Sequence, residues 1–139
     1  MLNTRISANW VGAGTAPLHI IEMSNYKIFH FINQSDLERY LNDSALEVPS
    51  LASQGFIHCS KLDQVIDVAN YIAPYSEEMR LIEIDEERII PEIRYENLDG
   101  GEKLFPHIYG PLNRDAIVAI HKLEWDGEDG YQLPEVLRF

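Results

Sequence analysis

GFIHCS, at residues 55–60, is the stretch that decides the fold, because it predicts a short strand that breaks directly into a helix. Side chains of a strand alternate between its two faces, so Phe56, His58 and Ser60 share one side. The next residues, 61–73, carry apolar side chains at the spacing of an amphipathic helix. The pattern therefore predicts a strand with a polar face that ends at a helix.

The start of that helix predicts a binding feature. Ser60 is expected to be its N-cap, with Asp63 three residues later in a box-like arrangement. His58 would then lie where the backbone N–H groups and the helix dipole favour an anion. A titratable side chain beside an anion site indicates a binding or catalytic cleft.

Composition limits the classes of partner. A chain of 139 residues is long enough for one domain with a core and too short for two ordinary domains. Its formal net charge is −12, from 11 Lys and Arg against 23 Asp and Glu. Binding to nucleic acids relies on neutralising phosphates with Lys and Arg, so we expect no nucleic acid and no membrane surface as partner.

The single cysteine and the N-terminal region predict the setting of the domain. Cys59 is alone, which excludes an internal disulfide and fits a reducing, cytoplasmic location. No apolar run reaches the length of a membrane span. Residues 1–25 lack the pattern of a secretory signal and are expected to be a flexible extension, followed by a single domain at 26–139.

The chain pattern predicts an α+β fold with two helices in its N-terminal half. Ser35 is expected to be the N-cap of a first helix that ends near residue 43, and the second helix covers 61–73. Residues 44–54 are expected to form a connecting segment between the first helix and the GFIHCS strand. Prolines bracket 105–112, which favours an ordered loop or a strand at a sheet edge. The other strand patterns are 26–32, expected to be central, 80–85, 93–96 and 116–123, with a hairpin predicted in the tail.

Three histidines are candidates for a site. His58 predicts an anion contact or general acid, the alternative being a histidine bonded to a backbone carbonyl. His30 interrupts an apolar strand, and a buried imidazole needs a hydrogen-bond partner in the protein or in a ligand. His107 lies near Tyr109 and either faces a cleft or packs at the surface with Phe105. The histidines are too scattered to match metal-ligand spacing, so no metal is expected.

Carboxylates and the thiol offer further chemistry. Glu96, at a strand end, or Glu102, after a Gly-Gly turn, would stabilise positive charge at a ribosyl carbon or activate a nucleophile. The alternative for each is a solvated surface residue, because acids are abundant. Cys59 faces away from His58, which favours a small core thiol over a Cys-His nucleophilic pair.

Three segments together resemble the small family catalogued as domain of unknown function 952. They are KIFH at 27–30, GFIHCS at 55–60 with Gln64 and Val65 behind it, and FPHIYGPL at 105–112. Glu96 matches the acidic residue of the family before the third segment. This chain departs from several members at Phe31 and Ile32, where they have Gly-Thr.

The resemblance also implies a fold. The family is similar to the ADP-ribosyltransferase-like fold, in which two small mixed or antiparallel sheets enclose a cleft for a nicotinamide dinucleotide. On this analogy His30 touches ribose hydroxyls, while His58 and Ser60 face the cleft. Tyr109 is the fourth residue expected to contact the ligand.

Two functions follow from these observations. The first is a transferase or hydrolase of the ADP-ribosyl type that takes NAD or an ADP-ribose derivative as substrate, with Glu96, His58 and His107 as catalytic residues. The pyrophosphate of this substrate would rest near the helix start at Ser60. The second is a non-catalytic module that binds such a nucleotide-type ligand, or binds a protein through its acidic surface.

Overall fold

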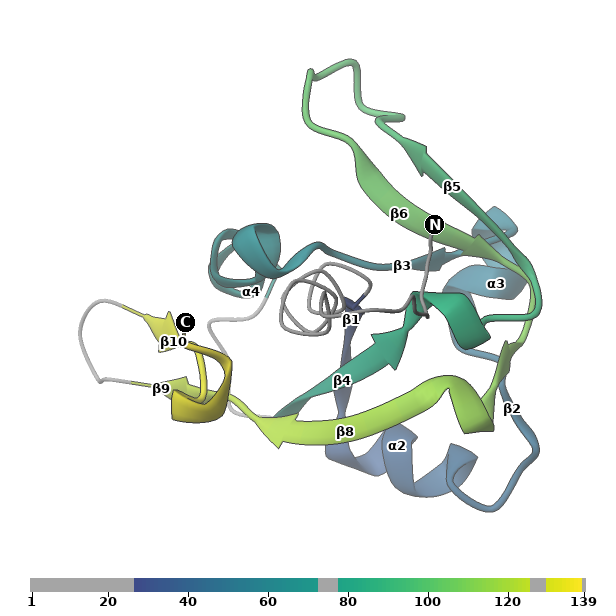
Figure 1. Ribbon diagram of the computed structural model, residues 1–139, viewed down its shortest axis with the longest axis horizontal. Coiled ribbons are helices and arrows are strands. Elements are labelled where there is room, and N and C mark those ends of the chain that lie inside the picture. Colours follow the sequence, from purple (N-terminus) through teal and green to yellow (C-terminus); the bar gives the residue numbers. More distant parts are fainter. Residues whose placement is uncertain (1–26, 73–77, 126–129, 139) are drawn as a thin grey trace, which may run out of the picture.

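The frame of the molecule consists of two three-stranded antiparallel sheets (Figure 1). The structure is a computed structural model that describes residues 27–72, 78–125 and 130–138, so the predicted extension at 1–25 lies outside it. One sheet has the order β1-β4-β8, with strands Lys27–Asn33, Met79–Asp85 and Ile117–Lys122. The other has the order β3-β6-β5, with strands Ile57–His58, Phe105–Tyr109 and Glu92–Glu96.

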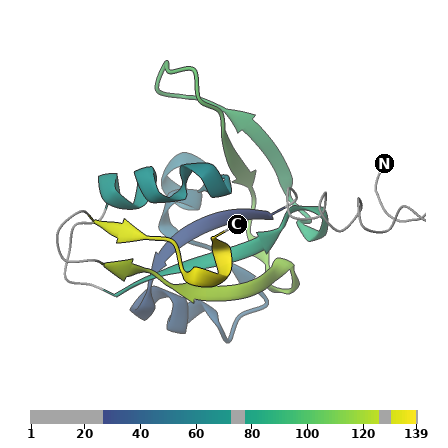
Figure 2. The ribbon, with the colours of Figure 1, turned by 60° about the vertical axis from the view of Figure 1, so that its left-hand side comes forward.

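Short elements complete the described fold. Two antiparallel pairs join β2 (Ala45–Leu46) to β7 (Leu112–Asn113) and β9 (Glu124–Trp125) to β10 (Tyr131–Gln132). The α-helices are α2 (Gln34–Tyr40), α3 (Pro49–Gln54) and α4 (Val65–Ile72). Single 3-10 turns lie at Leu62–Gln64, Glu86–Arg88, Arg114–Ala116 and Glu135–Leu137. Figure 2 shows α2 and α4 on opposite sides of the β1-β4-β8 sheet.

Strand β1 is apolar on both faces because each face lies in a different core. Ile28 and Ile32 belong to a cluster that includes the inward side chains of both sheets. Phe29 points the other way, into a cluster with Val65 and Ala69 of α4. Alternation along a strand divides its side chains in this way. The expectation of a central strand was wrong, however, since β4 is the middle strand and β1 lies at the edge of its sheet.

An isolated bridge joins that edge of β1 to the end of β3. The Phe29 N–H donates to the Ser60 carbonyl at 2.8 Å, and the Ser60 N–H donates to the Phe29 carbonyl at 2.7 Å. This pair holds the two sheets together at one point. It places His30, the next residue of β1, beside the backbone of His58.

Both predicted helix caps were wrong by a few residues. Asn33 caps α2, because its side-chain oxygen accepts from the Asp36 N–H at 2.8 Å, and Ser35 lies inside the helix. Ser60 is paired with β1 and caps nothing. The next helical segment begins with a 3-10 turn after Lys61, whose N–H donates to the Gln64 side chain at 2.9 Å.

The sequence pattern also missed elements. Residues 44–54, expected to be a connection, contain β2 and α3, so the described chain has three helices where two were expected. The segment 105–112 contains β6, the middle strand of its sheet. A proline is tolerated there because β3 is short and forms few ladder bonds with β6. The Pro106 carbonyl accepts from the Cys59 N–H at 3.0 Å, and the bond missing from this pair is the one that an N–H at position 106 would donate to the Cys59 carbonyl. Strands predicted at 80–85, 93–96 and 116–123 are confirmed by β4, β5 and β8.

Candidate functional site

A cavity of about 500 Å³ opens where the two sheets meet. Its floor contains His30 of β1 together with His58 and Ser60 at the end of β3. Its walls come from the start of α3, from α4 and from the loop between β5 and β6. Pockets of this size accommodate small molecules, which makes the cavity the candidate binding site.

His30 presents an unprotonated nitrogen in this cavity. Its side chain is 9 % exposed, and Nδ1 lies 2.5 Å from the His58 carbonyl oxygen. A carbonyl only accepts, so Nδ1 carries the hydrogen and Nε2 is left as an acceptor. Burial lowers the pKa of His30 to about 4, and the bond to the carbonyl opposes this shift only in part. The imidazole is therefore neutral at pH 7.

Ser60 brings a hydroxyl to the same floor. Its side chain is 3 % exposed, and its backbone groups are taken by Phe29. Among the residues that the structure describes, the hydroxyl has no hydrogen-bond partner. A buried hydroxyl without a partner loses free energy relative to its state in water, so this group is suited to contact a ligand.

His58 lies between the cavity and the outer face of the β3-β6-β5 sheet. Its Nε2 is 2.6 Å from the Gln54 Oε1, so Nε2 donates and Nδ1 is an acceptor. Partial burial lowers the pKa of His58, the nearby His107 lowers it further, and Asp99 acts in the opposite direction. Like His30, it offers a lone pair and no free donor.

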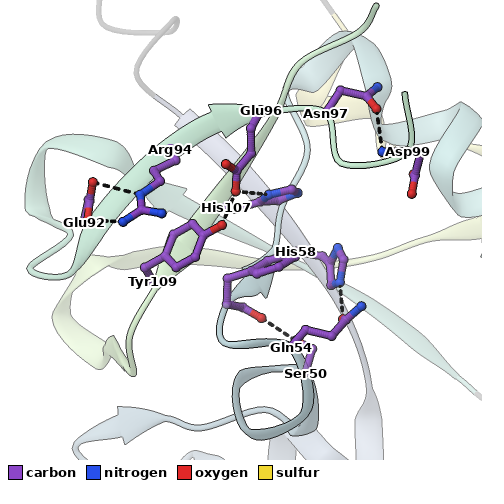
Figure 3. A network of polar contacts seen from close by, with 11 residues as sticks. Ser50, Gln54, His58, Glu92, Arg94, Glu96, Asn97, Asp99, His107 and Tyr109 are labelled. Atoms are coloured by element: carbon purple, nitrogen blue, oxygen red, sulfur yellow. Dashed lines mark hydrogen bonds and ion pairs between the residues drawn. The ribbon is translucent and has the colours of Figure 1, made fainter. Parts of the chain in front are cut away.

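Glu96, His107 and Tyr109 form a hydrogen-bonded group, here called the Glu96 cluster (Figure 3). The Glu96 Oε1 accepts from His107 Nδ1 at 2.9 Å and from the Tyr109 hydroxyl. These two bonds, the Tyr109 bond first, hold the pKa of Glu96 below its ordinary value. The bond to Glu96 in turn raises the pKa of Tyr109.

Aromatic and basic side chains support the Glu96 cluster. The His107 ring stacks on Phe56, with ring centres 4.2 Å apart and planes inclined by 26°. Arg94 lies over the Tyr109 ring, with its guanidinium carbon 4.2 Å from the ring centre, and is paired with Glu92 at 3.0 Å. The sheet register explains this grouping, since His58 faces His107 and His107 faces Arg94 across neighbouring strands.

The six residues selected from the sequence therefore separate into two groups. His30 and Ser60 line the cavity, whereas Glu96, His107 and Tyr109 do not. His58 lies next to both, with its ring centre 5.4 Å from that of His107. Tyr109, expected to contact the ligand, donates its hydroxyl to Glu96.

The remaining sequence candidates occupy other positions. Glu102 is exposed in the loop after β5. Cys59 is buried in the core, where desolvation raises the pKa of its thiol. His121 is bonded to Glu83 at 2.7 Å in the β1-β4-β8 sheet, away from the cavity lining.

Sequence reasoning missed several side chains of the site, four of which matter for its chemistry. These four are Gln54, Phe56, Tyr71 and Asp99. Phe56 was visible as the residue two before His58 on the same strand face, but its stacking on His107 required the register with β6. Tyr71 and Asp99 come from a helix end and a loop, and no local pattern indicates that they approach the cavity.

The described part of the chain contains neither a metal-binding cluster nor a membrane-spanning helix. Across residues 27–72, 78–125 and 130–138, no group of three or more His, Cys, Asp or Glu side chains is arranged to hold a metal ion. In the same ranges, no helix is long and apolar enough to cross a membrane.

The fold and site define an α+β protein with a histidine-lined cavity at the junction of two small antiparallel sheets. Residues 31–120 match the model of the family described as protein of unknown function (DUF952), and the chain belongs to this family. The resemblance seen in the sequence is thus confirmed at the level of the family. A search among curated proteins gave no match.

Solved structures support the same fold. The crystal structure of protein CC0527 from Caulobacter crescentus has 22 % sequence identity and a TM-score of 0.68, over 80 % of this chain and 97 % of that chain. The solution NMR structure of CC0527 gives a TM-score of 0.64, over 76 % of this chain and 90 % of that chain. At this identity the likeness shows a shared fold and carries no statement about activity.

Proposed function

We propose that the chain binds a small nucleoside-type ligand, related to NAD or ADP-ribose, in the cavity of about 500 Å³. One observation carries the proposal: two buried polar groups at the cavity floor, His30 Nε2 and the Ser60 hydroxyl, have capacity for hydrogen bonds that the described protein residues do not fill. Buried polar groups are normally bonded, so a ligand is their expected partner.

The chemistry of the cavity suits such a ligand. The hydroxyls of a ribose are donors and would bond to the acceptor nitrogens of His30 and His58. Phe31, Tyr71 and Phe105 in the lining supply aromatic surface for a planar base. The resemblance to the ADP-ribosyltransferase-like fold, which is part of this proposal, suggests the same ligand class.

Ligand-induced stabilisation tests the binding function. The full chain is heated with nicotinamide riboside, nicotinamide mononucleotide, NAD and ADP-ribose, and with ribose alone as the comparison. A ligand at about a hundred times its Kd stabilises the folded state by about 2.7 kcal/mol. The response must be lost in His30→Phe and kept in His121→Phe, because only the first histidine lines the cavity. Absence of any response to all four compounds contradicts the proposal.

Catalysis of ADP-ribosyl transfer or hydrolysis is a second candidate function. The observation in its favour is the position of His58, which borders the cavity and lies beside His107 of the Glu96 cluster. Because Glu96 lies outside the cavity lining, its carboxylate would stabilise positive charge only at a ribosyl carbon held on the His58 side of the cavity, where the His58 lone pair would act as a base. His107 would hold Glu96 in place.

Replacing Glu96 by Gln separates an enzyme from a binding protein. An enzyme should lose turnover of NAD by at least about a hundredfold while its affinity for the ligand stays within about twofold. Glu102→Gln is the matched control, because this glutamate is exposed in the same hairpin. Unchanged turnover in Glu96→Gln, or no turnover in the unaltered chain, removes the catalytic candidate and leaves the binding function.

A further inference from the structure

We propose that the cavity prefers an unphosphorylated ribonucleoside, and most of all one with a cationic base, over the corresponding nucleotide or dinucleotide. This inference rests on the proposed binding function and specifies its substrate class. It departs from the expectation that a pyrophosphate rests near Ser60. Three features of the described residues support it.

The first feature is the charge of the cavity lining. Asp36 and Asp99 contribute carboxylates, and among the described lining residues there is no Lys or Arg. Protein sites for phosphate normally use arginine, lysine or free backbone N–H groups. Asp36 is paired with Arg39 on the surface, whereas Asp99 has no ion pair within the described part of the chain. A phosphate entering here would meet an unbalanced carboxylate.

The second feature is the direction of the hydrogen bonds. The one N–H of His30 is used by the His58 carbonyl, and the one N–H of His58 is used by Gln54. Both histidines therefore present acceptors to a ligand. A phosphate dianion also consists of acceptors, so it cannot bond to either histidine and would depend on hydroxyl donors such as Ser60, whereas ribose hydroxyls can donate to both histidines.

The third feature is the orientation of the helices. Of the two lining residues of α4, Tyr71 lies in the last turn, where the helix dipole is negative and favours a cation, and Val68 lies one turn earlier. The start of α3 also borders the cavity, but it provides few donors. Pro49 has no N–H, and the Leu51 N–H is bonded to the Val48 carbonyl at 2.9 Å, so Ser50 is the one residue among the first three of α3 that keeps a backbone N–H unbonded within the described chain.

The rim of the cavity explains the preference for a cationic base. Tyr71 lines the cavity although its side chain is 87 % exposed, which leaves the ring available to stack on a planar group. Asp99 lies at the same cavity, on the loop between β5 and β6. An aromatic face attracts cations, and a carboxylate adds to that attraction. A pyridinium ring linked to ribose combines both properties.

Calorimetric titration of the full chain tests this preference with a matched ligand series. Nicotinamide riboside and nicotinamide mononucleotide differ only by the 5′-phosphate, and NAD carries a pyrophosphate. At pH 7.5 and 0.15 M salt we expect the riboside to bind at least about tenfold more tightly than the mononucleotide, a difference of about 1.4 kcal/mol. Uncharged nicotinamide, without ribose, should bind more weakly than the riboside.

Charge reversal at the rim provides the second arm. Asp99→Lys should improve binding of the mononucleotide about tenfold, because a cation replaces the unpaired carboxylate. The preference for the riboside over the mononucleotide should therefore shrink or reverse. Asp43→Lys is the control, since this exposed aspartate does not line the cavity, and it should change neither affinity.

The outcomes separate the inference from the function on which it rests. Binding of NAD or the mononucleotide at least as tightly as the riboside overturns the inference and leaves the proposed function standing. An unchanged preference in Asp99→Lys also contradicts it. Absence of binding by all three compounds overturns the inference, and only if ADP-ribose also fails to bind does it remove the proposed function as well.

Discussion

His30 and His107 are buried to a similar degree, with 9 % and 5 % of their surface exposed, yet their surroundings differ. His107 is held by the Glu96 carboxylate and stacked on Phe56. His30 has one bond to a backbone carbonyl, and its second nitrogen lies at a cavity without a protein partner among the described residues. The Glu96 cluster is thus satisfied by the protein itself, and the cavity floor is not.

This difference distinguishes residues that shape the site from residues that await a ligand. Removing a member of the satisfied cluster should lower the stability of the fold, because its partners lose their bonds. Removing an unsatisfied group from the cavity floor should cost little stability and should instead weaken ligand binding. The next three predictions test this distinction, from the largest expected effect to the smallest.

Truncation of His107 should have the largest effect. His107→Ala removes the hydrogen bond to Glu96 and the ring stacked on Phe56, so we expect a loss of about 3 kcal/mol in the free energy of unfolding. Urea denaturation measures this loss. His121→Ala is the control: it removes a histidine–glutamate bond without such a stack and should cost about 1 kcal/mol. Equal losses in the two variants would show that His107 in the Glu96 cluster stabilises the fold no more than the His121–Glu83 bond does.

Acid should destabilise the protein through His30. The folded-state pKa of His30 is about 4, against 6.5 for the ordinary side chain. As the pH falls from 6.5 to 4, the unfolded chain takes up a proton at this residue and the folded chain does not. The free energy of unfolding should therefore fall by about 3 kcal/mol over that range from this residue alone.

The His30→Gln variant isolates this contribution. Because glutamine does not titrate, urea denaturation at pH 7 and at pH 4 should show a smaller difference in the variant than in the unaltered protein. The lowered pKa of His58 acts in the same direction and remains in both proteins. An identical pH dependence in the two proteins would mean that the pKa of His30 is the same in the folded and unfolded states, which contradicts the prediction.

Two serines of the cavity lining give the smallest and sharpest test. Ser50 donates its hydroxyl to the Phe56 carbonyl at 2.8 Å, whereas the Ser60 hydroxyl has no partner within the described chain. Ser50→Ala should cost about 1 kcal/mol in the free energy of unfolding, and Ser60→Ala should leave it within about 0.5 kcal/mol or raise it. If Ser60→Ala lowers the free energy of unfolding by about 1 kcal/mol or more, that hydroxyl has a protein partner after all.

Much of the strand content was predictable because local alternation carried it. The apolar pattern of β4 and the alternation of β5 placed both strands within a residue or two of their observed bounds. The two-residue strands β2 and β7 and the six-residue α3 were not predictable, since so few residues show no period. Pro106 favoured a loop or an edge strand, yet it lies in the middle strand β6. Its missing N–H removes little pairing there because the neighbouring strand β3 has only two residues.

The candidate site was predictable only in part. His30, His58 and Ser60 were selected from residue type and face, and the structure brings them to one cavity. The strand face of Ser60 was predicted correctly, but its expected role as a helix cap was wrong, because its pairing with Phe29 depends on a strand far earlier in the sequence. The bond between His30 and the His58 backbone was hidden for the same reason, because it joins residues 28 positions apart.

The sequence by itself determined the strand faces, the acidic balance and the family, because these follow from residue types and from neighbours close along the chain. Tertiary structure alone decided which histidine keeps a carboxylate partner and which one faces a cavity. Hydrogen-bond partners from distant strands set that choice, and burial keeps the His30 ring neutral by lowering its pKa to about 4. An imidazole acquires its role from the groups that the fold places around it.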